Sequence, residues 1–225
     1  MENTQPILTE KRGFDVKTWV TLGMLAAVAY LVMVVGRIPM VLFLRYDPKD
    51  VIITIGGFLY GPFAALIVSL VVSLVEMFTV SDTGFIGFIM NVLSTCSFAC
   101  TAAVLYKRRQ SLKGAVAGLA AGVLLTTCVM LVWNYLITPL YMKVDREQVA
   151  ALLIPAFLPF NLVKGGLNAA ITLLLYKPVV TGLRKARLVP QSQSQQGGLN
   201  KTVYIVYTLA LATFILLALS LMGII

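Results

Sequence analysis

One lysine in the middle of a long apolar segment is the residue of this chain best placed to do chemistry. Lys164 lies between Asn161 and Asn168 at the spacing i, i+3 and i+7, so the three polar side chains share one face of a helix. A charge at the centre of a membrane helix costs ~2.5–3.5 kcal/mol on insertion scales, and it therefore normally faces a cavity or a partner. Pro155 and Pro159, just upstream, interrupt helical hydrogen bonding, and the carbonyls they free need protein or water at membrane depth. The pattern predicts a polar pocket wall.

Other apolar segments could supply groups that face this wall. Asn134 lies beside Trp133, Asn91 and Thr95 share a helical face at i and i+4, and Glu76 lies near the end of its segment. Amides both donate and accept hydrogen bonds, and aromatic faces stack, so the set suits a neutral, planar, hydrogen-bonding ligand. Asparagines in membrane helices also join helices at about 0.6 kcal/mol each, and for Asn91 both readings stay open. The position of Glu76 favours a solvated side chain.

The residues that catalysis would need are missing from the sequence. The chain has no histidine and its apolar segments contain no pair of carboxylates, so we expect no enzyme, no cofactor and no metal site. Cys96, Cys100 and Cys128 lie in apolar runs, where cysteine is a small core residue. The string nearest to a phosphate-binding loop, residues 198–202, has Asn200 where glycine must precede lysine. Energy from nucleotide hydrolysis would therefore have to come from partner proteins.

The elements that position these residues are membrane helices. Of the 225 residues, 59% are hydrophobic and 12% charged, against about half and a quarter in soluble domains. Apolar runs near the ~20 residues that cross a bilayer predict an all-α integral membrane protein. The expected spans of a six-helix core are residues 18–36, 51–60 paired with 63–79 as a hairpin, 85–106, 114–137 and 149–176. Asp47 and Pro48 favour a turn before the second span, with Asp50 as its N-cap. The expected domains are an N-terminal segment (1–17), this core (18–186), a flexible polar linker (187–201) and an additional C-terminal transmembrane helix (202–225).

The positive charges indicate how the chain is oriented. Although the net charge of +9 could suggest nucleic acid, twelve of the eighteen basic residues fall at alternate ends of successive spans, as cytoplasmic loops do. They are Lys11, Arg12, Lys17, Lys107, Arg108, Arg109, Lys113, Lys177, Arg184, Lys185, Arg187 and Lys201. The distribution predicts a multi-pass protein of the cell membrane with a cytoplasmic N-terminus, and it argues against a nucleic-acid partner.

Small residues at four-residue spacing predict close helix contacts. Gly114, Gly118 and Gly122 form a row that favours packing inside the bundle. Gly23 and Ala27 form a shorter pair on the first span, and the spacing alone leaves open whether that pair packs internally or docks a partner protein.

Five stretches of the chain together resemble one known family. LRYDPKD (44–50), GGFLYGP (56–62), EMFTVSDTG (76–84), WNYLITPLY (133–141) and PFNLVKGG (159–166) are similar to motifs of the riboflavin-binding S components of energy-coupling factor (ECF) vitamin transporters. The resemblance covers about residues 18–186. It implies a six-helix membrane protein that captures riboflavin from outside the cell, with the flavin phosphate FMN as an open second ligand. An S component for another small vitamin or cofactor is the alternative.

The resemblance also implies roles for particular residues. Polar contacts to the isoalloxazine ring fall on Asn134, Asn161 and Lys164, and the segment that covers the ligand falls on Leu44 and Tyr46. With Asn168, Asn91 and Trp133 from the polar faces above, these residues make up the expected riboflavin site. The implied partners are a transmembrane coupling protein and two ATPase subunits. Docking in the family uses two small residues of the first helix, where this chain has Gly23 and Ala27, so glycine replaces one alanine.

Overall fold

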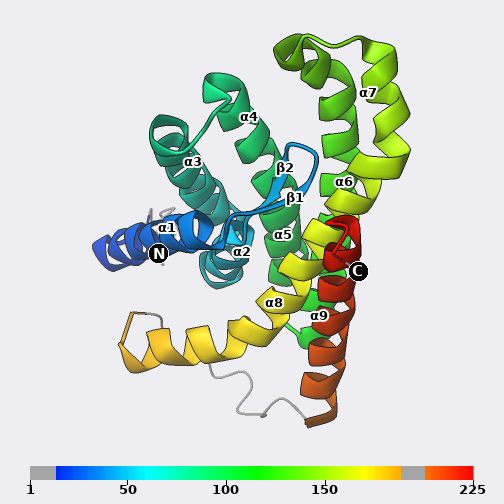
Figure 1. Ribbon diagram of the computed structural model, residues 1–225. Coiled ribbons are helices and arrows are strands. Elements are labelled where there is room, and N and C mark those ends of the chain that lie inside the picture. Colours follow the sequence, from blue (N-terminus) through cyan, green and yellow to red (C-terminus); the bar gives the residue numbers. More distant parts are fainter. Residues whose placement is uncertain (1–13, 189–200, 225) are drawn as a thin grey trace, which may run out of the picture.

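The computed structural model describes residues 14–188 and 201–224. Helices make up nearly all of this part of the chain, which confirms the all-α membrane fold (Figure 1). The predicted N-terminal segment 1–17 and polar linker 187–201 lie largely outside the described residues. The elements in order are α1 (Val16–Gly36), β1 (Ile38–Val41), β2 (Leu44–Tyr46), α2 (Lys49–Tyr60), α3 (Pro62–Thr79), α4 (Gly84–Thr95), the π-helix η1 (Cys96–Cys100), α5 (Thr101–Arg108), α6 (Leu112–Met142), α7 (Arg146–Leu152), the π-helix η2 (Leu153–Phe157), α8 (Leu158–Lys185) and α9 (Lys201–Leu221).

Six helical segments of the described chain are long and apolar enough to cross a membrane. They are Val16–Gly36, Pro62–Thr79, Gly84–Arg108, Leu112–Met142, Arg146–Lys185 and Val203–Leu221. The second predicted span differs, because α2 has only 12 residues. At 1.5 Å per residue it is about 18 Å long, which is less than the ~30 Å hydrocarbon core. Ten of its residues are buried, so α2 is an interior helix enclosed by its neighbours.

Local signals explain where the helices begin and turn. The Asp15 carboxylate caps α1 by accepting a hydrogen bond from the Thr18 backbone N–H at 3.0 Å. Between α2 and α3, Gly61 adopts φ +94° and Pro62 opens α3, which gives the tight hairpin expected there. The predicted N-cap at Asp50 is wrong, because the capping position is Pro48 and Asp50 lies in the first turn of α2. Its carboxylate is used inside the bundle instead.

The interruption predicted at the prolines takes the form of a π-helical turn. The segment η2 contains Pro155, and α8 begins directly after it with Pro159 in its first turn. A proline cannot donate a hydrogen bond to the preceding turn, and a wider turn is one way in which a helix accommodates the loss. The segments α7, η2 and α8 therefore follow one another without a gap, and Lys164 lies in α8 beyond the π-helical turn.

The glycine row of α6 packs against a neighbouring helix, as its spacing predicts. A Cβ on Gly118 would lie 2.7 Å from the carbonyl oxygen of Ala102, and one on Gly122 would lie 2.7 Å from that of Phe98. Both oxygens belong to the backbone of η1 and α5, which cannot move aside cheaply. The row therefore sets the distance between α6 and the η1–α5 segment.

The C-terminal helix α9 lies beside α8 (Figure 1). The Phe214 ring fits against Gly166, where a Cβ would come within 2.2 Å of the ring atom Cε1. The outer face of α9 remains apolar and exposed, with Leu209 at 63% and Leu216 at 56%. An apolar face of this kind suits lipid.

A methyl group added at Gly122 should loosen the contact between α6 and η1. We expect Gly122→Ala to lower the free energy of unfolding in detergent by about 1–3 kcal/mol, because the Phe98 carbonyl must shift. Thermal unfolding followed by loss of helical circular dichroism measures the change. Gly182→Ala on α8, whose Cβ meets nothing within 4 Å, is the matched control and should unfold at the wild-type temperature or above. Equal stability of the two variants would contradict the packing role.

Candidate ligand-binding site

The structure gives Lys164 a charged partner on another helix. Its side chain on α8 is 12% exposed, and its Nζ lies 3.8 Å from Oδ2 of Asp50 in the first turn of α2. A buried ammonium beside a carboxylate avoids the cost of an unpaired charge. The other carboxylate oxygen of Asp50 accepts a hydrogen bond of 2.7 Å from the Thr95 hydroxyl of α4. Asp50 therefore joins α2, α4 and α8 at one point.

Asn168 links this point to the β-hairpin formed by β1 and β2. Its amide nitrogen donates to Oδ2 of Asp50 at 3.3 Å, and its carbonyl oxygen accepts from the Tyr46 hydroxyl at 2.9 Å. Asn168 is 1% exposed and Tyr46 is 7% exposed. A hydrogen-bonded chain thus runs from the hairpin through α8 to α2, and it brings together Tyr46, Asn168 and Lys164 from the predicted site.

The hairpin presents its apolar side to α8. Its strands are antiparallel, with Ile38 opposite Tyr46 and Val41 opposite Leu44. Leu44 and Tyr46 are buried whereas Arg45 between them is exposed, as strand alternation requires. Leu44 belongs to one apolar cluster with Phe157 and Phe160. The segment expected to cover the ligand therefore packs on the helix that carries the predicted polar contacts.

The other polar residues of the predicted site differ in how far their side chains are hydrogen-bonded. The buried amides of Asn134 and Asn161 each donate to the carbonyl four residues earlier, at 2.7 Å, and the Asn134 oxygen accepts from Thr138 at 2.9 Å. Within the described residues the Asn161 oxygen has no hydrogen-bond donor. In the same part of the chain, the indole N–H of Trp133 is buried without an acceptor. Asn91 is half-buried on α4, and its side chain forms no hydrogen bond to the described residues.

A second set of buried charges adjoins Asp50 and escaped the sequence interpretation. Lys49 is 1% exposed, and its Nζ lies 2.5 Å from Oε2 of Glu76 and 3.7 Å from Oδ2 of Asp47. Arg37 approaches the other Glu76 oxygen at 3.9 Å and donates to the Val80 carbonyl at 3.1 Å. The expectation of a solvated Glu76 is wrong, because its side chain is 2% exposed and faces α2. The available signal was the run of charges in residues 45–50 just before a short apolar segment.

The buried cations and anions around Asp50 are equal in number. The network has three cations and three anions: Arg37, Lys49, Lys164, Asp47, Asp50 and Glu76. Burial by itself would raise the pKa of Asp47 in the loop, but the charges of Lys49, Lys164 and Arg37 outweigh burial and hold that pKa below its ordinary value. We define the six side chains as the buried charge network.

Fold and site together define a multi-pass membrane protein with a polar site enclosed between helices and a hairpin. The chain matches the family model of the ECF transporter, substrate-specific component, over residues 17–176, and it belongs to that family. As the substrate-specific component of a transporter, it is not an enzyme, and the family confirms the expectation of no catalytic site. The helix α9 lies beyond the matched residues.

Proteins similar to this chain agree with that assignment. It is 30% identical to the riboflavin transporter RibU of Staphylococcus aureus (strain TCH60), over 75% of this chain and 93% of that protein. It is 26% identical to the riboflavin transporter FmnP of Bacillus subtilis (strain 168), over 77% of this chain and 98% of that protein. A solved S component of a bacterial ECF transporter superposes with a TM-score of 0.63 at 29% identity, covering 75% of this chain and 98% of its own.

Removing the central cation of the network should destabilise the fold. We expect Lys49→Met to lower the free energy of unfolding by about 3–5 kcal/mol, because Glu76 and Asp47 both lose their nearest cation. Thermal unfolding in detergent measures the loss. Arg45→Met is the control: it breaks an ion pair with Asp82 whose side chains are 47% and 77% exposed, and it should cost less than about 1 kcal/mol. The network would lack the stabilising role described above if both variants unfolded at the same temperature.

Proposed function

We propose that this chain is the riboflavin-binding subunit of an ECF uptake transporter. In this proposal it captures riboflavin outside the cell and delivers it inward with an ATP-driven coupling module. The observation that carries the proposal is the position of Lys164, whose ammonium is held by Asp50 beside the hydrogen-bonded Asn168–Tyr46 pair and below the hairpin. The riboflavin transporters to which the chain is similar support the choice of ligand.

The polar side chains match the chemistry of the flavin ring. The ring edge of riboflavin carries two carbonyl oxygens, which need donors, and one imide N–H, which needs an acceptor. Lys164 and the indole N–H of Trp133 are donors, and the side-chain oxygen of Asn161 is an acceptor; the last two have no partner among the described residues. Asn134 lies next to Trp133 on α6. We assign ring contact to Asn134, Asn161, Lys164 and Trp133, cover to Leu44 and Tyr46, and support from the protein side to Asn168 and Asn91.

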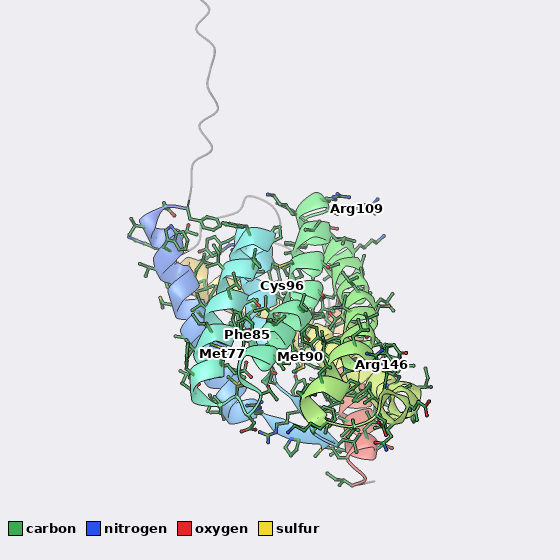
Figure 2. The ribbon with its side chains drawn as sticks, turned by 90° about the horizontal axis from the view of Figure 1, so that it is seen from above. Met77, Phe85, Met90, Cys96, Arg109 and Arg146 are labelled. Atoms are coloured by element: carbon green, nitrogen blue, oxygen red, sulfur yellow. The ribbon has the colours of Figure 1, made fainter. Side chains whose placement is uncertain are left out.

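The charges at the two ends of the bundle support an outward-facing site. Arg109, in the most basic loop, and Arg146 lie toward opposite ends of the bundle (Figure 2). Arg45 of the hairpin pairs with Asp82, so the hairpin shares its end with the loop between α3 and α4. Under the positive-inside rule the Arg109 end is cytoplasmic, which places the hairpin outside. The N-terminus is then cytoplasmic.

A surface of α1 supports the docking of a coupling protein. Leu22, Leu25 and Ala26 face the core, whereas Gly23 and Ala27 are exposed. A Cβ on Gly23 would meet nothing within 4 Å, so the pair leaves room for another backbone to approach closely. We propose this face for contact with the transmembrane coupling protein, to which two ATPase subunits supply the energy.

Loss of either polar group on α8 should weaken flavin binding. We expect Lys164→Ala and Asn161→Ala each to raise the riboflavin Kd about tenfold or more, because a ring carbonyl or the imide loses its partner. Quenching of riboflavin fluorescence on titration into the detergent-solubilised protein measures the Kd. Lys113→Ala removes the same charge from an exposed position in the first turn of α6 and should bind as wild type. Unchanged affinity in both α8 variants would refute the site, and tight binding of a different vitamin with none of riboflavin would refute the ligand.

The α1 surface can be tested apart from the ligand site. We expect Gly23→Leu to leave riboflavin affinity unchanged but to abolish uptake by cells that carry the coupling module, because the leucine holds the helices apart. Gly23→Ala, which preserves a small side chain, is the control and should keep most of the uptake. Normal uptake by Gly23→Leu would show that this face contacts only lipid.

A further inference from the structure

Helix α9 meets the rest of the bundle through one stripe of residues, spaced alternately four and three apart. The stripe consists of Tyr207, Leu211, Phe214, Ala218 and Leu221. Tyr207 and Ala218 are buried, and the other three are partly buried. The opposite face, with Leu209 and Leu216, is exposed. This stripe is therefore the surface that holds α9 to the protein.

The stripe meets α8 directly beside Lys164. Two glycines follow this lysine, and each lets a different helix approach α8. A Cβ on Gly165 would lie 2.9 Å from Cγ1 of Val123 on α6. One on Gly166 would lie 2.3 Å from Cζ of the Phe214 ring on α9. Helix α8 is thus held between α6 and α9 at the residues next to its ammonium.

The same stripe also meets the hairpin. The C-terminal end of α9 lies on the hairpin side of the bundle in both views (Figure 1, Figure 2), and α9 contacts β1. Ala218 and Leu221 belong to one apolar cluster with Met40 of β1, Leu44 of β2 and Phe160 of α8. Helix α9 therefore joins the hairpin to α8 by apolar contacts, in addition to the hydrogen bond between those two elements.

This connection is an addition to the fold of the family. The family match ends at residue 176, before α9 begins. The matched 77% of this chain covers 98% of FmnP, and 75% covers 98% of the solved S component. Neither protein has an unmatched stretch long enough for another membrane helix. Any effect of α9 on the site is therefore a property of this chain rather than of the shared core.

We propose that α9 is a strap that holds the hairpin against α8 and thereby slows the exchange of the ligand. The inference rests on the proposed function, in which the hairpin covers the ligand. A ligand enters or leaves when the hairpin separates from α8, and this separation also breaks the apolar contacts with α9. Because the strap acts on the closed hairpin whether the site is empty or filled, it slows entry and release alike. The affinity stays nearly unchanged.

The rates of ligand exchange test the strap. Association is followed by stopped-flow quenching of riboflavin fluorescence, and release by a chase of labelled riboflavin with excess unlabelled riboflavin, on the full-length protein in detergent. We expect Phe214→Ala to raise both rate constants about fivefold or more and to keep the Kd within about twofold, because the ring no longer fills the notch at Gly166. Leu216→Ala, on the 56% exposed lipid face of α9, is the matched control and should exchange ligand as wild type.

A second measurement needs no ligand. Hydrogen exchange of the backbone amides of residues 38–46 reports how often the hairpin opens. In the ligand-free protein we expect Phe214→Ala and Leu221→Ala each to speed this exchange about threefold or more, and Leu216→Ala to leave it unchanged. Leu221→Ala, at the hairpin end of the stripe, is a milder change that keeps the test valid if Phe214→Ala does not fold.

The possible outcomes separate the strap from other roles of α9. Unchanged exchange rates in both stripe variants would overturn the proposal. Faster release with unchanged association, and therefore weaker affinity, would also overturn it, because α9 would then support the shape of the site rather than restrain its cover. If the wild-type protein bound no riboflavin, the proposed function would fail. The amide exchange of the hairpin would still show whether α9 holds it closed.

Discussion

The pairing of charges inside the bundle is the constraint on which the rest of the structure depends. An unpaired buried charge costs several kcal/mol, so each cation of the buried charge network fixes the position of at least one anion. The pairs join segments that lie far apart in the sequence, such as Lys164 of α8 with Asp50 of α2 and Lys49 of α2 with Glu76 of α3. The helices cannot shift relative to one another without separating a pair. The same pairs hold the ammonium of Lys164 in place, and in the proposed site a preorganised contact of this kind would lower the cost of binding.

The short length of α2 determines where its first turn, part of the proposed ligand-binding site, lies in the bundle. Its C-terminal end lies near the basic end of the bundle, since the Tyr60 hydroxyl donates to the Leu188 carbonyl beyond α8. Helix α2 is about 18 Å long, which is ~12 Å shorter than a ~30 Å hydrocarbon core. Measured from its C-terminal end, it therefore cannot reach the opposite side of the bilayer. The first turn of α2, with Lys49 and Asp50, is buried inside the bundle. Next to it lies the hairpin, whose Leu44 and Tyr46 are buried.

The sequence predicted more of the fold than of the site's interior. Long apolar runs and the Gly61–Pro62 turn located the helices, because the bilayer requires continuous helices of a set length. The shared face of Asn161, Lys164 and Asn168 could be predicted because all three residues lie on one helix. Their partners on other helices could not be predicted, because spacing within one helix gives no information about another helix. Asn168 and Asp50, for example, are 118 residues apart. For the same reason Asp50 looked like an N-cap and Glu76 like a solvated end residue, whereas both pair across helices.

Helix α8 contacts different partners through different residues. One face carries the polar residues and is held by Asp50 and Tyr46. Gly166 lies against Phe214 of α9, a helix beyond the residues that match the family. The apolar cluster of α8 and the hairpin also takes in Ala218 of α9. Since α9 packs against both the helix with Lys164 and the hairpin, its packing bears on the geometry of the proposed site.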